Sequence, residues 1–117
     1  MHELSLAAAV IEELERLVRR EGARRVARVV LRAGALSGVE PDALRFAFPA
    51  AAEGTCVEGA ELVIESEPLQ VRCRACGAQT EADPLWLVCA ACGGDEVAIA
   101  AGADLTLRSA ELIADGD

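Results

Sequence analysis

Two periods of apolar residues divide the first third of the chain into a helical and an extended segment. Between Leu4 and Arg20 apolar residues recur at steps of three and four, which places them on one stripe of a helix. From Val26 to Leu36 the pattern alternates, with β-branched residues in the middle, as in a strand with one solvated face. Gly22 is suited to end the helix, because glycine readily adopts the left-handed conformation that follows a helix C-terminus.

Proline and the same alternation locate the remaining elements. Pro41 is well placed in the first turn of a second helix, where its missing N–H has no helical partner. Pro49 lies further along the same apolar pattern, and it predicts that this helix is kinked or ends early. Alternating residues at 60–65 predict a second strand, and further strands are expected at 97–100 and 105–112.

The alternation also predicts charge pairs across the sheet. Arg28 and Arg32 share one face of the first strand, and Glu61 and Glu65 occupy the outer face of the second. If these strands are neighbours, the guanidinium and carboxylate groups pair. Each exposed pair adds only about 0.2–1 kcal/mol to stability.

Two Cys-x-x-Cys pairs are the strongest chemical signal in the chain. Cys73 and Cys76 are separated from Cys89 and Cys92 by twelve residues, and doubled pairs of this kind are typical of zinc sites. Four thiolates at about 2.3 Å from a zinc ion complete a tetrahedron and leave no open position for substrate. The pattern therefore indicates a structural metal site before a catalytic one.

Other interpretations of these cysteines have less support. Disulfides need an oxidising compartment, and the first residues lack the basic region of a secretory signal, which favours a cytoplasmic protein. A redox Cys-x-x-Cys usually occurs as a single pair, whereas spacing alone does not exclude iron in a sulfur site. Cys56 lies outside the pattern, and we expect it to be a small buried residue.

Composition limits the core and the classes of partner. The chain has 117 residues, of which 53% are apolar but only three are aromatic, so its core is expected to be small and aliphatic. A net charge of −9 argues against nucleic-acid binding, and no apolar run is long enough for a membrane span. All eleven cations are arginine, and seven lie between Arg16 and Arg32. This cluster is either a docking site for an acidic partner or, with more support, a solvated face.

A second candidate metal site lies at the start of the chain. The α-amine of Met1 and the amide and imidazole of His2 can close adjoining chelate rings, with a further group from Glu3. Nitrogen donors in a plane suit nickel(II) and copper(II), whereas zinc prefers a tetrahedron. The free N–H groups of a helix start are available as ligands, but the helix dipole disfavours a cation there by about 0.3–1 kcal/mol. The spacing alone leaves open whether His2 binds a metal or is simply solvated.

Over nearly its whole length the sequence resembles one family. The shared features are the Met1-His2-Glu3 start, the amphipathic first helix, Gly34-x-Leu36, Val39-x-Pro41, Leu44-x-Phe46-x-Phe48, Gly54-Thr55 and the two cysteine pairs. They resemble the HypA (HybF) family of hydrogenase nickel incorporation proteins. The Met-His-Glu start joined to this cysteine spacing is specific, although either feature alone is weak.

The resemblance implies a nickel metallochaperone for maturation of nickel–iron hydrogenase, and not an enzyme. It implies nickel binding by Met1, His2 and Glu3, and structural zinc at the four paired cysteines. The implied partners are the GTPase HypB and the hydrogenase large subunit, with urease maturation proteins as a further class because some relatives serve urease. The chain departs from the family at Ala90-Ala91, where many members have proline, and at Asp104, where glutamate is usual. Neither departure changes a ligand.

Together the patterns predict an α+β fold. A small mixed β-sheet is packed by two helices and carries an inserted four-cysteine zinc-ribbon subdomain. In this prediction residues 1–70 plus 97–117 form a nickel-binding α/β domain, and residues 71–96 form the inserted zinc-binding knuckle. The alternative function is a zinc-ribbon adaptor that binds protein or nucleic acid without a labile metal, which the acidic balance and the lack of lysine weaken.

Overall fold

The computed structural model describes residues 2–114 and divides into two compact units. Unit 1 consists of Met1–Leu31, Val39–Ile64 and Leu107–Asp117, and unit 2 consists of Arg32–Gly38 and Glu65–Thr106. Three strands, β1 (Ala23–Gly34), β2 (Glu61–Glu67) and β6 (Leu105–Ala114), have residues in both units. Within residues 2–114 the fold is α+β with two helices, as the sequence predicts.

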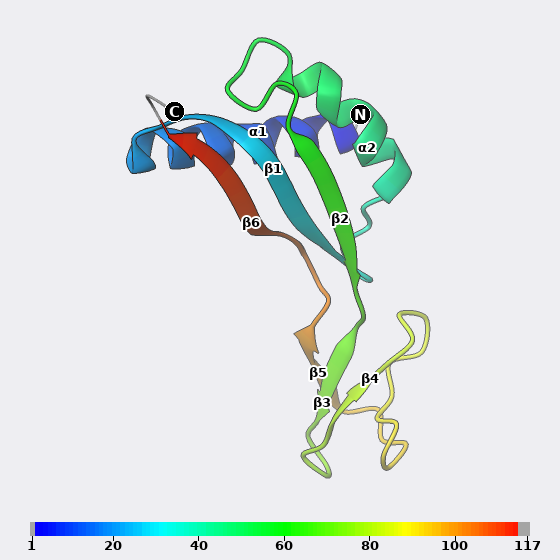
Figure 1. Ribbon diagram of the computed structural model, residues 1–117. Helices are drawn as coiled ribbons and strands as arrows, with labels where there is room; N and C mark the ends of the chain where they lie inside the picture. The colour runs from blue at the N-terminus through cyan, green and yellow to red at the C-terminus, as the bar shows by residue number, and fades with distance from the viewer. Residues whose placement is uncertain (1, 115–117) are drawn as a thin grey trace. The chain divides into compact units, whose positions relative to one another are not determined.

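Unit 1 is built on a three-stranded sheet with the order β2-β1-β6. Helix α1 (His2–Glu21) lies across one face of this sheet, and α2 (Pro41–Ala52) packs against α1 (Figure 1). The buried face of α1 repeats at helical spacing, so burial of this stripe, and not helix propensity alone, holds the helix in place. The apolar core of unit 1 consists of Ala7, Ile11, Leu14, Val18, Val26, Val29, Val30, Leu31, Leu44, Phe48, Ala52 and Val57.

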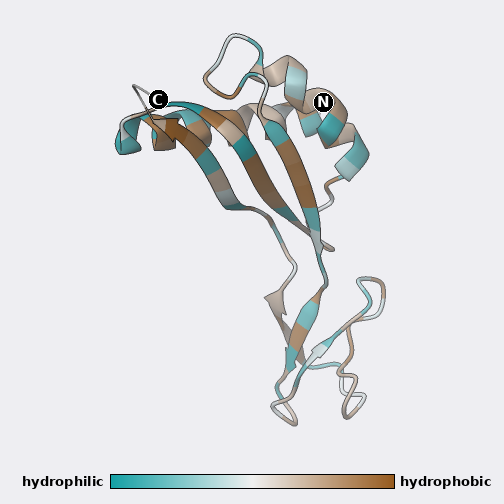
Figure 2. Cartoon of the chain, viewed as in Figure 1, coloured by the Kyte–Doolittle hydropathy of each residue, from teal (hydrophilic) through white to brown (hydrophobic). Residues whose placement is uncertain are grey.

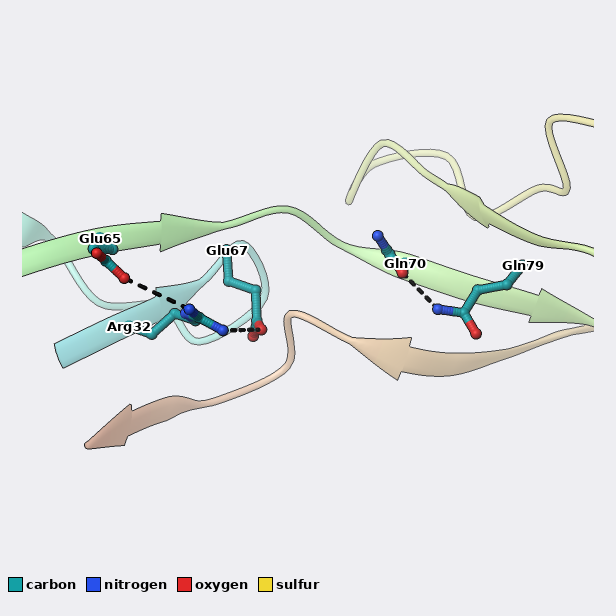
Figure 3. A network of polar contacts seen from close by, with 5 residues as sticks. All are labelled: Arg32, Glu65, Glu67, Gln70 and Gln79. Atoms are coloured by element: carbon teal, nitrogen blue, oxygen red, sulfur yellow. Dashed lines mark hydrogen bonds and ion pairs between the residues drawn. The ribbon is translucent and has the colours of Figure 1, made fainter. Parts of the chain in front are cut away.

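The charge pairs expected across the sheet are present. Arg28 lies 3.4 Å from Glu61, and Arg32 lies 3.6 Å from Glu65 and 3.7 Å from Glu67 (Figure 3). The pairing of 28 with 61 and of 32 with 65 means that β1 and β2 run in the same direction, while β6 runs opposite to β1 in Figure 1. The sheet is therefore mixed.

Helix α2 differs from its prediction at one point. It continues through Pro49 to Ala52, so an early end at the proline, one of the two predicted alternatives, is wrong, while the kink stays a prediction. Leu44, Phe48 and Ala52 are all buried on one face, and this packing holds the segment helical on both sides of Pro49. At its start, the Glu40 side chain accepts a hydrogen bond from the Asp42 N–H at 3.2 Å, which caps the helix.

Unit 2 contains a second three-stranded sheet with the order β4-β3-β5. Its central strand β3 (Gln70–Cys73) is antiparallel to both β4 (Gln79–Glu81) and β5 (Val97–Ala101). Because β5 pairs with β3, the compact unit around the cysteines is larger than the segment 71–96. The assignment of separate metal functions to 1–70 plus 97–117 and to 71–96 stays a prediction.

Candidate metal centre

The four paired cysteines are brought together at one end of the β4-β3-β5 sheet. Cys73 is the last residue of β3, Cys76 lies in the turn that follows it, and Cys89 and Cys92 lie in a second turn before β5. Their Sγ atoms all lie within 4.8 Å of one another. The sequence prediction that these four residues share one site agrees with this geometry.

The two cysteine turns are built alike. The Gly77 N–H donates to the Cys73 carbonyl at 3.0 Å, and the Gly93 N–H donates to the Cys89 carbonyl at 2.8 Å. Both glycines have a left-handed backbone, with φ of 78° and 77°, which residues with a Cβ rarely adopt. Each turn therefore carries its two thiols on a bend that a glycine closes.

Backbone N–H groups point at the sulfur atoms. The Cys76 N–H lies 3.5 Å from the Cys73 sulfur, and the Gly94 N–H lies 3.4 Å from the Cys92 sulfur. The Ala90 N–H donates to the Thr80 hydroxyl at 3.1 Å, which ties the second turn to the strand β4. The N–H groups of Cys76 and Gly94, which face sulfur, stabilise thiolate over thiol, since an ionised sulfur is the stronger acceptor.

The distances between sulfurs fit a tetrahedral ion. Cys73 and Cys92 have their Sγ atoms 3.6 Å apart, and Cys76 and Cys89 have theirs 3.7 Å apart. A tetrahedron with metal–sulfur bonds of about 2.3 Å has sulfur–sulfur edges of about 3.8 Å. The same separations are far longer than a disulfide bond of about 2.05 Å, and all four cysteines are free. The donor set therefore fits zinc, with four sulfur ligands and no open position.

Ionisation of the thiols also favours a bound cation. A backbone hydrogen bond from Cys76 lowers the pKa of Cys73, and one from Cys92 lowers the pKa of Cys89 to about 6. The Gly94 N–H lowers the pKa of Cys92, but the neighbouring sulfurs of Cys73 and Cys76 outweigh it and raise that pKa to about 11. Four thiolates this close repel one another, and a divalent cation removes that repulsion.

Burial divides the set into two pairs. Cys73 and Cys89 are 2% and 1% exposed, whereas Cys76 and Cys92 are exposed to solvent. The fifth cysteine, Cys56, lies in unit 1 and is half-buried, with its pKa raised chiefly by burial. It is not part of the cluster, as predicted, but it is less buried than the sequence prediction expects.

The residues of the proposed nickel site are only partly described. Met1 lies outside the described residues, as does the side chain of His2, the first residue of α1. Glu3 is half-buried in the first turn of α1. It borders an apolar surface groove of about 420 Å³ whose other lining residues are Leu4, Ala43, Phe46, Ala47 and Ala50.

Sequence patterns missed two exposed apolar features. Phe46 is 88% exposed at this groove, and Leu85 and Trp86 are 96% and 71% exposed in the loop before Cys89. The signal for Phe46 is its position on α2, two residues from both Leu44 and Phe48, which places it away from the buried stripe. Leu85 and Trp86 lie in a turn, where exposure does not follow a helical or strand periodicity and cannot be predicted from the pattern.

Comparison with known proteins identifies the family. The family model described as "Hydrogenase/urease nickel incorporation, metallochaperone, hypA" matches residues 1–112. The chain belongs to the HypA family. Hydrogenase maturation factor HypA of Nitrosospira multiformis is 45% identical over 113 residues, which cover 97% of this chain and 98% of that protein. Hydrogenase maturation factor HypA of Aquifex aeolicus is 40% identical over 115 residues, covering 98% and 100%.

Solved structures agree with this assignment. The solution structure of the Ni metallochaperone HypA from Helicobacter pylori has a TM-score of 0.75 at 27% identity and covers 97% of this chain and 98% of its own. HypA proteins are nickel incorporation and maturation factors and not enzymes, which confirms that part of the sequence prediction. Neither α1 nor α2, the helices within residues 2–114, is long and apolar enough to cross a membrane.

Proposed function

We propose that this chain binds Ni(II) at its N-terminus and delivers it for the maturation of nickel–iron hydrogenase. Its membership of the nickel incorporation family over residues 1–112 carries the proposal. Nickel is assigned to Met1, His2 and Glu3, and structural zinc to the four clustered cysteines. Because four sulfur donors already complete a tetrahedron, an exchangeable ion needs a different donor set.

The proposed donors separate the two metals by their chemistry. The α-amine of Met1 and the amide and imidazole of His2 offer nitrogen, which suits nickel in a planar arrangement, while thiolates in a tetrahedron suit zinc. His2 is the one histidine of the chain, so imidazole coordination has a single possible source. When bound, zinc holds the two cysteine turns together, and the chain around it supplies the hydrogen bonds to sulfur.

The proposal extends to partners and location. The GTPase HypB and the hydrogenase large subunit are the proposed partners, and the cytoplasm is the proposed location. Urease maturation proteins are included because the family description names urease as well as hydrogenase. Delivery requires that nickel be held weakly enough to be transferred, which favours a short terminal chelate over a closed cage.

Nickel titration of the untagged, zinc-loaded protein tests the proposal. We expect the native chain to bind one nickel ion, and we expect His2→Ala to weaken binding by about tenfold to a hundredfold or more, since a ligand is lost. A Gly-Ser extension before Met1 should have a similar effect because it removes the α-amine from its place. Glu12→Gln, an exposed change on the same helix, is the matched control.

Acid should release nickel as well. The imidazole and the α-amine have reference pKa values of about 6.5 and about 7.7–8.0, and both must lose a proton to coordinate. The proposal is wrong if nickel affinity survives both His2→Ala and the extension while zinc stays bound. Absence of nickel binding at neutral pH, together with salt-dependent binding to nucleic acid, would favour the zinc-ribbon adaptor instead.

A further inference from the structure

The turn between α1 and β1 concentrates exposed arginines. Gly22 joins the two elements with a φ of 67°, and its N–H donates to the Arg19 carbonyl at 3.3 Å. This reversal places the last turn of the helix beside the first residues of the strand, a hydrophilic region in Figure 2. We call Arg19, Arg20, Arg24 and Arg25 the arginine turn. All four are exposed.

Most of this positive charge is not compensated locally. Among residues 2–114, one carboxylate lies within 4 Å of a guanidinium of the arginine turn. It is that of Glu21, 3.5 Å from Arg20. Two further exposed arginines of unit 1 are paired within their own helices, Arg16 with Glu13 and Arg45 with Asp42. The arginine turn is therefore a locally positive surface on a chain whose net charge is −9.

A contribution to fold stability accounts for two of the four arginines of the arginine turn and not for the other two. Arg19 and Arg20 lie in the last turn of α1, where the helix dipole favours a cation. Arg24 and Arg25 follow in β1, where no such dipole acts and where neighbouring side chains normally face opposite sides of a sheet. Both are nevertheless exposed, so neither contributes to the core. Their side chains are therefore available to a ligand outside the chain.

We propose that the arginine turn binds a short acidic segment of a partner protein. Guanidinium groups match carboxylates through paired hydrogen bonds, which makes arginine the better residue for this recognition. A short peptide experiences mainly the charges within about 8 Å, the screening length at physiological salt. An extended polyanion, such as a nucleic acid or an anionic membrane, also meets the acidic remainder of the chain and is disfavoured. The proposal does not depend on nickel binding.

A labelled oligoglutamate peptide is a suitable probe. Its binding to the full-length, zinc-loaded chain can be followed by fluorescence anisotropy. We expect binding at an ionic strength of about 0.02 M that weakens markedly at about 0.15 M. The double variant Arg24→Gln, Arg25→Gln should weaken binding by about tenfold, from the loss of two charge pairs.

The control variant has the same change in net charge at a different place. Arg45→Gln with Arg72→Gln removes two exposed arginines, on α2 and β3, whose side chains already contact Asp42 and Gln79, and it should leave peptide affinity within about twofold of the native value. Both variants change surface side chains, and far-UV circular dichroism with zinc analysis checks that each is folded. Equal weakening by the two variants, or no salt-sensitive binding by the native chain, overturns the proposal. Tighter binding of a single-stranded oligonucleotide of equal charge overturns the choice of a protein ligand.

Discussion

Gly102 shows how tightly single residues constrain unit 2. Its φ is 90°, and an added Cβ would lie 2.5 Å from the Pro68 carbonyl oxygen and 2.8 Å from the Leu69 Cα. We expect Gly102→Ala to lower the free energy of unfolding by about 2–4 kcal/mol, because left-handed strain and a backbone clash act together. Gly38→Ala is the control, since Gly38 has a φ of 74° but open space around it. It should cost only about 1–2 kcal/mol.

Urea unfolding of the zinc-loaded proteins measures both values. If the two alanine variants lose the same stability, the close approach of Gly102 to Pro68 and Leu69 does not constrain the fold. The sequence gives no sign of this difference, because both glycines look like ordinary turn residues. What distinguishes the two glycines is the segment of Pro68 and Leu69, which is distant from Gly102 in sequence but packs against it in space.

Cysteine substitutions separate metal binding from packing. We expect Cys76→Ser and Cys73→Ser each to lower zinc content well below one ion per chain after dialysis, since both remove a thiolate ligand. Cys76 is exposed and Cys73 is buried, so an equal effect identifies coordination, and not burial, as the cause. Cys56→Ser should retain zinc, because this residue lies outside the cluster. Metal analysis that finds full zinc content in Cys76→Ser would contradict the four-thiolate site.

The residues of the cysteine site could be predicted because the signal is local. Each Cys-x-x-Cys is a single turn, and the doubled spacing limits the chemistry to few metals. Which thiols are buried could not be predicted, since that depends on how β3 and the second turn pack. The second carboxylate of Arg32 was missed for a related reason. Glu67 follows Glu65 on the same face of β2, but the alternating pattern from which the charge pairs are predicted covers only 60–65.

At the scale of elements, the long periodic segments were predictable and the short ones were not. The stripe of α1 extends over five turns, which is enough for the period to be clear. Strands β3 and β4 have only four and three residues, too few to show a period. The start of β1 at Ala23 was also missed, because Arg24 and Arg25 interrupt its apolar pattern, whereas backbone hydrogen bonding defines the strand.

Pro49 gives a prediction for α2. It lies inside the helix and is exposed, and a proline there lacks the N–H that would bond to the preceding turn. We expect Pro49→Ala to raise the free energy of unfolding by about 1–2 kcal/mol, less than the full helix preference of about 3 kcal/mol because proline also restricts the unfolded chain. The measurement is thermal unfolding, with Ala50→Gly, expected to lower stability by about 1 kcal/mol, as the opposite control. A lower midpoint for Pro49→Ala would mean that the proline is needed for packing at this helix.

At the scale of the whole molecule, the two units differ in how much apolar core they have. The core of unit 1 is a set of aliphatic side chains and Phe48 from both helices and the sheet. In unit 2 the buried apolar residues are Ala33, Leu69 and Val71, together with Cys73 and Cys89. Because two of these five are proposed metal ligands, the stability of unit 2 is expected to depend on the ion, as in other small metal-bound domains.

Hydrogen exchange after zinc removal tests this dependence. With a chelator present, we expect fast exchange at the Cys89 and Gly93 amides, whose hydrogen bonds close the second cysteine turn. Amides in the middle of α1, such as that of Leu14, should keep their protection because no cysteine of the cluster contributes to the core around them. Local opening of one unit then precedes global unfolding. Simultaneous loss of protection in both units would show instead that the metal site and the helices form one cooperative structure, since β1, β2 and β6 pass through both.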